Sequence, residues 1–150
     1  MRLPCVDRVK CEEGSTLLEF PLICVMFILV LLSVVEIGRM VLVYTTVANA
    51  ARAGARYAIV HGGDRTGSGV NGPSGPGSTS QIQTVVQNFA SGGLLTTSRL
   101  TINVSYPDGT NTPGSRVSVQ VTYPYDPLVS YFNASLSSTV GSMSQGVIAF

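Results

Sequence analysis

Charged residues are scarce in this 150-residue chain. Asp, Glu, Lys and Arg together make up 11% of it, whereas a typical soluble domain has about 25%. The formal net charge of +1 excludes the basic field that would hold nucleic acid, so we expect no nucleic-acid partner. An apolar content of 45% argues equally against a chain that is disordered throughout. The length is that of one domain.

Side chains that carry chemistry are also few. The cysteines all lie in the first 24 residues, at Cys5, Cys11 and Cys24, so the rest of the chain has no internal disulfide. Beyond residue 60 the candidates are His61, Asp64, Asp108 and Asp126. They form neither an acid–base pair nor a metal cluster. A Gly-x-Gly-x-x-Gly match at residues 67–72 has no strand before it and is not interpreted as a nucleotide site. We expect no catalytic residue, metal or cofactor.

The apolar residues are concentrated near the N-terminus. From Leu17 to Val43 the chain is almost continuously apolar, and a helix of that length extends roughly 40 Å. The hydrocarbon core of a bilayer needs only about 30 Å, so the sequence predicts a membrane-spanning helix. Glu36 and Arg39 are three residues apart on one helix face, and we expect them to pair with each other near the outer interface.

The flanks of this span predict its orientation. Three basic residues precede it, at Arg2, Arg8 and Lys10. Basic residues beside a span favour the cytoplasmic side. Three acids in the same tail and three arginines after the span (Arg39, Arg52 and Arg56) oppose this signal. Because only a short tail precedes the span and a whole domain follows it, we expect a single pass with a cytoplasmic N-terminus.

Two kinds of N-terminal processing are compatible with such a span. Ala48-Asn49-Ala50 has the small-x-small pattern of a secretory cleavage site, but the apolar stretch before it is too long for a signal peptide. The other candidate is Gly14, which closes a polar leader and stands five residues before Glu19 and six before Phe20. This pattern resembles the prepilin-type signal, in which a membrane aspartyl peptidase cuts after Gly. The resemblance implies a cut between Gly14 and Ser15, with Glu19 as the fifth mature residue.

After the span the helical pattern continues to Gly62-Gly63. Small residues recur at three- and four-residue steps and form a stripe that allows close backbone approach, at Ala50, Ala51, Gly54, Ala55 and Ala58. Such a stripe suits either lateral packing of subunits or docking of a compact domain, and the pattern alone does not decide between them.

The remainder predicts a small α+β domain behind a linker. Residues 62–80 are rich in Gly, Ser and Pro and indicate a flexible tether. Ser80 is expected to cap a helix whose apolar face contains Ile82, Val86 and Phe89. Residues 99–106 and 116–123 alternate strictly and predict an antiparallel hairpin, with a weaker third strand at 136–143. The connector at 124–132 is expected to cover one open side of the sheet.

Three of these segments together resemble the TadE-like family. They are Glu19-Phe20 at the start of the span, Glu36-Ile37-Gly38-Arg39 at its end, and the small-residue run from Ala50 to Ala58. The family comprises pseudopilins, or minor pilins, of the Tad (Flp) pilus assembly and secretion machinery. The resemblance covers residues 14 to 60. It implies a pilin-like fold in a bacterial inner-membrane protein that the system's prepilin peptidase processes, with other Tad pilins and assembly platform proteins as partners.

We therefore expect four parts: a cytoplasmic leader (1–14), a transmembrane and extended helix (15–61), a linker (62–80) and an exported α+β domain (81–150). The first functional hypothesis is a pseudopilin that contacts membrane lipid and assembles through its N-terminal helix. The second is a membrane-anchored adhesive or ligand-binding module with the helix as a stalk. The third, a membrane-tethered enzyme, has the least support from the residues.

Overall fold

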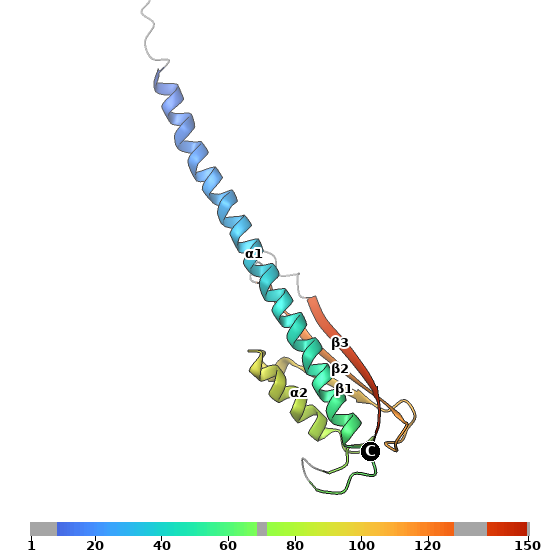
Figure 1. Ribbon diagram of the computed structural model, residues 1–150. Helices are drawn as coiled ribbons and strands as arrows, with labels where there is room; N and C mark the ends of the chain where they lie inside the picture. The colour runs from blue at the N-terminus through green and yellow to red at the C-terminus, as the bar shows by residue number, and fades with distance from the viewer. Residues whose placement is uncertain (1–8, 69–71, 128–137, 150) are drawn as a thin grey trace, which may run out of the picture. The chain divides into compact units, whose positions relative to one another are not determined.

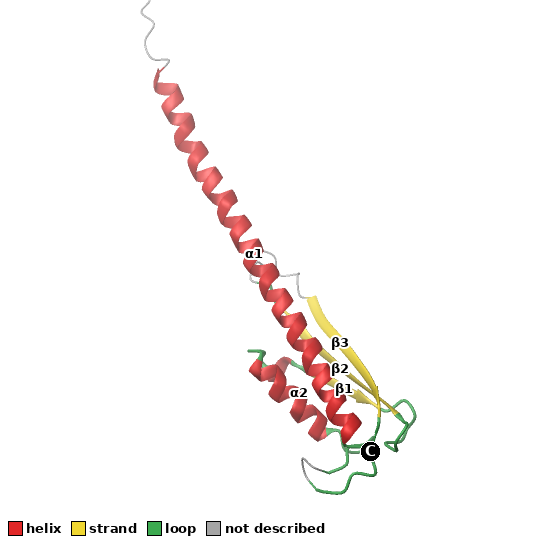
Figure 2. Ribbon diagram, in the orientation of Figure 1, coloured by secondary structure: helices red, strands yellow, loops and turns green. Residues whose placement is uncertain are grey.

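The computed structural model describes residues 9–68, 72–127 and 138–149, with side chains described from residue 18 onward. The elements in chain order are α1 (Val9–Val60), α2 (Ser80–Gly92), the short 3-10 helix η2 (Thr97–Arg99), β1 (Thr101–Ser105), β2 (Arg116–Tyr125) and β3 (Ser138–Val147) (Figures 1 and 2). The expected α+β class is confirmed. The chain divides into two compact units, one ending at Gly38 and one beginning at Arg39. We call the second unit, residues 39–150, the head.

The helix α1 is a single element from Val9 to Val60 and contains Pro21. Two hydroxyl side chains on α1 bond to their own helix: the Ser33 hydroxyl donates to the Leu29 carbonyl at 2.8 Å. The Thr45 hydroxyl donates in the same way to the carbonyl of Val41 at 3.0 Å. A helix suits this segment because it satisfies its backbone polar groups internally, which an apolar surrounding requires.

The three strands form one antiparallel sheet in the order β1-β2-β3. Thr101 of β1 pairs with Thr122, and β2 pairs with β3 over ten consecutive residues, from Arg116↔Val147 to Tyr125↔Ser138. The predicted alternation is confirmed, because Val117, Val119 and Val121 are fully buried while β1 alternates between exposed and half-buried positions.

The end of β2 differs from the prediction. Pro124 and Tyr125, expected in the connector, belong to β2 and pair with β3. Proline is tolerated there because β1 begins at Thr101, opposite Thr122, and no residue of β1 pairs with Pro124. Residues 128–132 of the expected connector lie outside the described residues. The third strand runs four residues farther than expected, to Val147.

The core of the head lies between the sheet, α2 and the part of α1 from Arg39 to Val60. Gly54 marks a close approach: a Cβ on it would lie 2.5 Å from Cγ2 of Val86 in α2 and 3.2 Å from Cγ1 of Val119 in β2. Gly146 of β3 likewise leaves no room for a Cβ beside Ile59. The absence of side chains at these two glycines allows α1 to contact the other helix and the sheet.

The helix α2 begins one residue earlier than a Ser80 cap requires. Ser80 is its first residue, and Thr79 takes the N-cap position without a side-chain hydrogen bond, so the expected capping role of Ser80 is wrong. Ile82, Val86 and Ala90 are buried as the helical spacing predicts, whereas Phe89 remains 46% exposed.

The segment between α1 and α2, which the sequence predicted to be a flexible tether, is bonded to the rest of the head at Ser74. Ser74 is 1% exposed, and its hydroxyl donates to the carbonyl of His61 at 2.8 Å. The amide of Asn111 donates to the carbonyl of Ser74 at 3.0 Å. The polar composition that suggested a free tether also supplies side chains that satisfy the C-terminal end of α1.

We expect Gly54→Ala to destabilise the head by about 1–2 kcal/mol. Overpacking costs about 1–3 kcal/mol, the β-branched Val86 cannot easily rotate away, and alanine recovers only about 1 kcal/mol of helix propensity. Thermal unfolding of the detergent-solubilised chain, followed by circular dichroism, measures the effect. Gly38→Ala is the matched control, because nothing lies within 4 Å of a Cβ at Gly38. Equal unfolding temperatures for the two variants would contradict the packing role of Gly54.

Candidate assembly surface

The first part of α1 presents an uncovered apolar surface. Its most apolar 18-residue window has a mean hydropathy of 2.8 and none of it is buried. The most exposed side chains include Leu18 at 77% and Phe20 at 71%. By length and composition this helix can cross a membrane, and it is the one such helix among the described residues.

Glu19 places a carboxylate on this apolar surface. Its side chain is exposed, and no described side chain forms an ion pair with it. Phe20 lies beside it and is equally exposed. Gly14 and Ser15, the predicted cleavage pair, have helical backbone within α1, while their side chains lie outside the description. Glu19 is thus accessible on the apolar surface of α1.

The stripe of small residues on α1 faces the core of the head. Ala50, Ala51 and Ala58 are 0% exposed and Ala55 is 2% exposed, and Gly54 is buried with them. All four alanines belong to the same core as the valines of β2. The sequence left open whether the stripe packs against other subunits or against a compact domain. In the structure the stripe packs against a compact domain of the same chain, which covers it.

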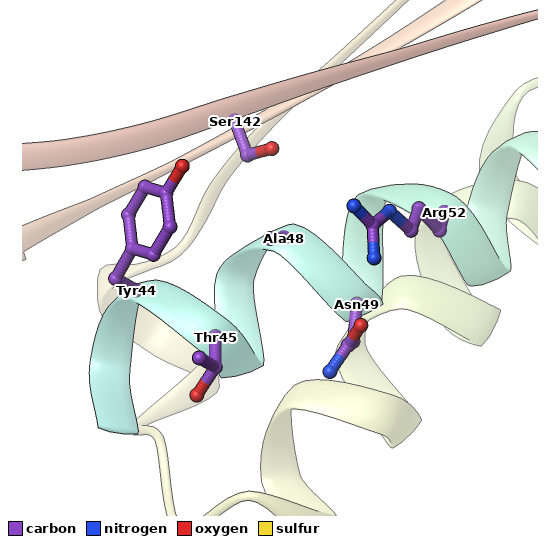
Figure 3. A pocket seen from close by; sticks show the side chains of 6 residues that line it. All are labelled: Tyr44, Thr45, Ala48, Asn49, Arg52 and Ser142. Atoms are coloured by element: carbon purple, nitrogen blue, oxygen red, sulfur yellow. The ribbon is translucent and has the colours of Figure 1, made fainter. Parts of the chain in front are cut away.

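A different face of α1 remains open beside β3. This face carries a groove of about 340 Å³, and Ser142 of β3 forms one of its walls (Figure 3). The residues of α1 that line it are Tyr44, Thr45, Ala48, Asn49 and Arg52. Arg52 and Arg56 are exposed one turn apart on α1. The groove is lined mainly by polar groups and small side chains.

The boundary between the two units is marked by Arg39. Its guanidinium carbon lies 5.5 Å from the centre of the Tyr125 ring, a cation–π geometry, and Tyr125 is 4% exposed at the end of β2. The expected pairing of Glu36 with Arg39 stays a prediction. The contact that the sequence did not reveal is the one between Arg39 and Tyr125, which joins the start of the head's helix to the end of its central strand.

The single histidine has a structural position. His61 stacks on Tyr57 with ring centroids 3.9 Å apart, and its Nδ1 lies 2.9 Å from the carbonyl oxygen of Tyr57. Burial raises the pKa of the Tyr57 hydroxyl. No group of three or more His, Cys, Asp or Glu side chains that could hold a metal occurs in the part of the chain that the structure describes.

Two acids of the head are held by arginines. Arg116 donates from its backbone N–H to Oδ2 of Asp108 at 2.7 Å and from Nη2 to Oδ1 at 2.7 Å. These bonds close the hairpin, since Asp108 follows β1 and Arg116 begins β2. Asp126 forms an ion pair with Arg99, which also lies over the ring of Tyr123. Asp108 thus holds the turn between β1 and β2, whereas Asp126 joins the end of β2 to the residues that precede β1.

The comparison with protein families now decides the relationship of the N-terminal part. Residues 14–56 match the model of the TadE-like protein family. The match confirms the resemblance and indicates a protein related to the Tad pilus. The TadE-like segment begins at Gly14, includes Glu19 and Phe20, and ends within the small-residue stripe. Comparison with curated proteins and with solved structures found no match.

Sequence reasoning missed the groove between α1 and β3. The groove depends on Ser142, which lies in a strand of Ser, Gly and Thr residues with little alternation to reveal it. One available signal was the spacing of Tyr44, Ala48 and Arg52, which fall one turn apart on a face of α1 that the small-residue stripe does not use.

We expect acid to weaken the head through Asp108. Hydrogen bonds from Arg116 lower the pKa of this carboxyl, so its contribution to stability is present above its unfolded pKa of about 3.9 and is lost as pH falls through the lower folded value. Thermal unfolding between pH 6 and pH 2 should show a smaller loss of stability in Asp108→Asn than in the wild type. Asp64→Asn, at an exposed acid, is the control. An identical pH dependence in the wild type and Asp108→Asn would refute this role.

Proposed function

We propose that this chain is a TadE-like pseudopilin that takes part in Tad (Flp) pilus biogenesis and secretion. The prepilin peptidase cleaves it after Gly14, and it assembles through its N-terminal helix. The observation that carries the proposal is the family match from residue 14 to residue 56, which starts at the predicted cleavage residue and contains an exposed apolar helix with one carboxylate near its beginning. The protein acts by assembly and not by catalysis.

The position of Glu19 explains why cleavage would precede assembly. A carboxylate near the start of a membrane helix is costly unless it has a partner, and Glu19 has no described cationic neighbour. Cleavage after Gly14 creates a new α-amino group on Ser15. In a bundle of parallel helices, the amino group of a neighbouring subunit can reach this carboxylate and form an ion pair in the apolar layer.

The bounds of the head support a single span. The head begins at Arg39, so an aqueous head leaves Leu18 to Gly38 for the hydrocarbon. These residues extend about 31 Å at about 1.5 Å per residue, close to the thickness of the apolar core. The span lies in the bacterial inner membrane, with residues 1–14 in the cytoplasm and the head in the periplasm or beyond. Other Tad pilins, pseudopilins and assembly platform proteins are the partners.

The alternative is a membrane-anchored adhesive or ligand-binding module, and the groove beside Ser142 is the feature that favours it. In that case α1 is only a stalk, and neither Gly14 nor Glu19 affects the activity of the head.

We expect the mature protein to begin at Ser15 in cells that contain the prepilin peptidase. Gly14→Leu should abolish this cut, because the peptidase requires the small residue before the bond, and the chain should keep its leader. N-terminal sequencing and intact mass measure the result, with Gly38→Ala as the control for a glycine change elsewhere in α1. A wild-type start at Met1 would remove the processing claim, and a start at Ala51 would indicate a secreted protein.

We expect Glu19→Gln to abolish pilus assembly or secretion while the head stays folded and exported. The substitution removes the charge that pairs with the neighbouring amine and preserves the size of the side chain. Electron microscopy of pili and a protease-protection assay on the head measure the two effects. Ser33→Ala is the matched control, because the Ser33 hydroxyl is already bonded within its own helix. Normal piliation in Glu19→Gln would favour the stalk alternative.

A further inference from the structure

The strand β3 has an open outer edge. In the described part of the chain no strand pairs with it on the side away from β2. Its ten residues, Ser138–Val147, contain no charged residue and no proline, and they pair with β2 without interruption. Natural proteins usually protect edge strands with charges, prolines, bulges or short length. β3 has none of these protections, so its edge can accept another strand.

The direction of β3 follows that of α1. Ser138, its first residue, pairs with Tyr125, and the Tyr125 ring lies against Arg39 at the start of the head. At the other end, the backbone N–H of Ala149 donates to the carbonyl of Ile59 at 3.0 Å. β3 therefore runs from the beginning of the head's helix toward its end (Figure 1).

This direction restricts which strand can be added. Copies inserted into one membrane in the same way have their α1 helices parallel, so their β3 strands also run the same way. Antiparallel pairing of two β3 strands would invert one of the two helices, which membrane insertion does not permit. β1 and β3 are both antiparallel to β2, so β1 runs parallel to β3. The β1 edge of a second copy thus has the direction that parallel pairing with β3 requires.

We propose that the outer edge of β3 binds β1 of a second copy as a parallel strand, so that the sheets of neighbouring heads become continuous. This proposal rests on the proposed membrane insertion, which sets the copies parallel. The interface is heterologous, since one edge of each head contacts the opposite edge of the next, and such contacts repeat into rings or filaments.

The register of the sheet identifies the facing residues. Asn103 of β1 lies opposite Gln120, which lies opposite Met143 of β3. When two neighbouring copies lie at the same level along the strand direction, Asn103 of one copy lies beside Met143 of the next. A shift of one copy along this direction moves the pairing by two residues on the same face of the sheet. Asn103 and Met143 are both exposed. β1 is uncharged too, so the two edges bring no like charges together.

The groove on α1 supports this location. It is lined by residues of α1 and by Ser142 of β3, the strand whose outer edge is open (Figure 3). A head added at β3 would close this groove with its own helical layer. Exposed Arg52 and Asn49 would then lie in the contact and provide hydrogen-bond donors to the neighbour.

Disulfide cross-linking tests the proposal with the full-length chain in membranes. Cys5, Cys11 and Cys24 are first replaced by Ala, and Asn103→Cys and Met143→Cys are placed on separate, differently tagged chains that are expressed together. Adjacent strands lie about 4.8 Å apart, within the Cα separation that a disulfide spans. Oxidation should shift both tags to one band of twice the chain mass. Thr101→Cys and Ser105→Cys, paired with Met143→Cys, test the two shifted registers.

The controls separate this interface from others. Gln120→Cys lies on the same face in the central strand, and paired with Met143→Cys on another chain it should give no dimer band. A strong dimer of Met143→Cys alone would indicate antiparallel β3 pairing and overturn the proposal. Absence of cross-links in all three registers would overturn it as well.

The same samples distinguish failure of this interface from failure of the proposed function. Chains that fractionate with membranes and begin at Ser15, but do not cross-link, would refute the strand pairing alone. Chains that do not enter the membrane would refute the proposed function, and the pairing with it.

Discussion

The approach of α1 to α2 and β2 at Gly54 is the constraint on which the head depends. Small residues allow the helix backbone to lie close to both partners, and the buried alanines extend this contact over several turns. The two buried helices then cover the apolar face of a sheet that three strands could not bury alone. The residues that resemble a helix–helix packing motif therefore build the protein's own core, and the surfaces left uncovered are the first part of α1, the open face of α1 beside β3 and the edges of the sheet.

Much of this arrangement was predictable from periodicity. The apolar run and the small-residue steps predicted α1, and strict alternation predicted β1 and most of β2, because buried faces impose a period of 3.6 on helices and 2 on strands. The family resemblance rested on local residues of α1 and is confirmed there. The cleavage after Gly14 and the role of Glu19 remain predictions, since they concern a peptidase and a neighbouring subunit.

The rest depends on contacts between distant segments. Nothing in the local sequence indicates that Ser74 bonds to the end of α1 and to Asn111. The Gly- and Ser-rich composition of this segment therefore predicted a free tether. β3 was only weakly predicted, because its inward positions at Ser142, Ser144 and Gly146 are small where α1 lies close. Tyr125 seemed to belong to a connector because Pro124 precedes it, and it belongs to β2 because it pairs with Ser138 of β3.

The parallel course of α1 and β3 has a mechanical consequence. The chain enters the head at Arg39, and the contacts at Gly54 and at Ile59 with Gly146 lie along the same helix. A pull along the axis of this helix would load these contacts in shear, so that they resist together and do not open one after another. The head can therefore carry tension along its helix while its sheet stays intact.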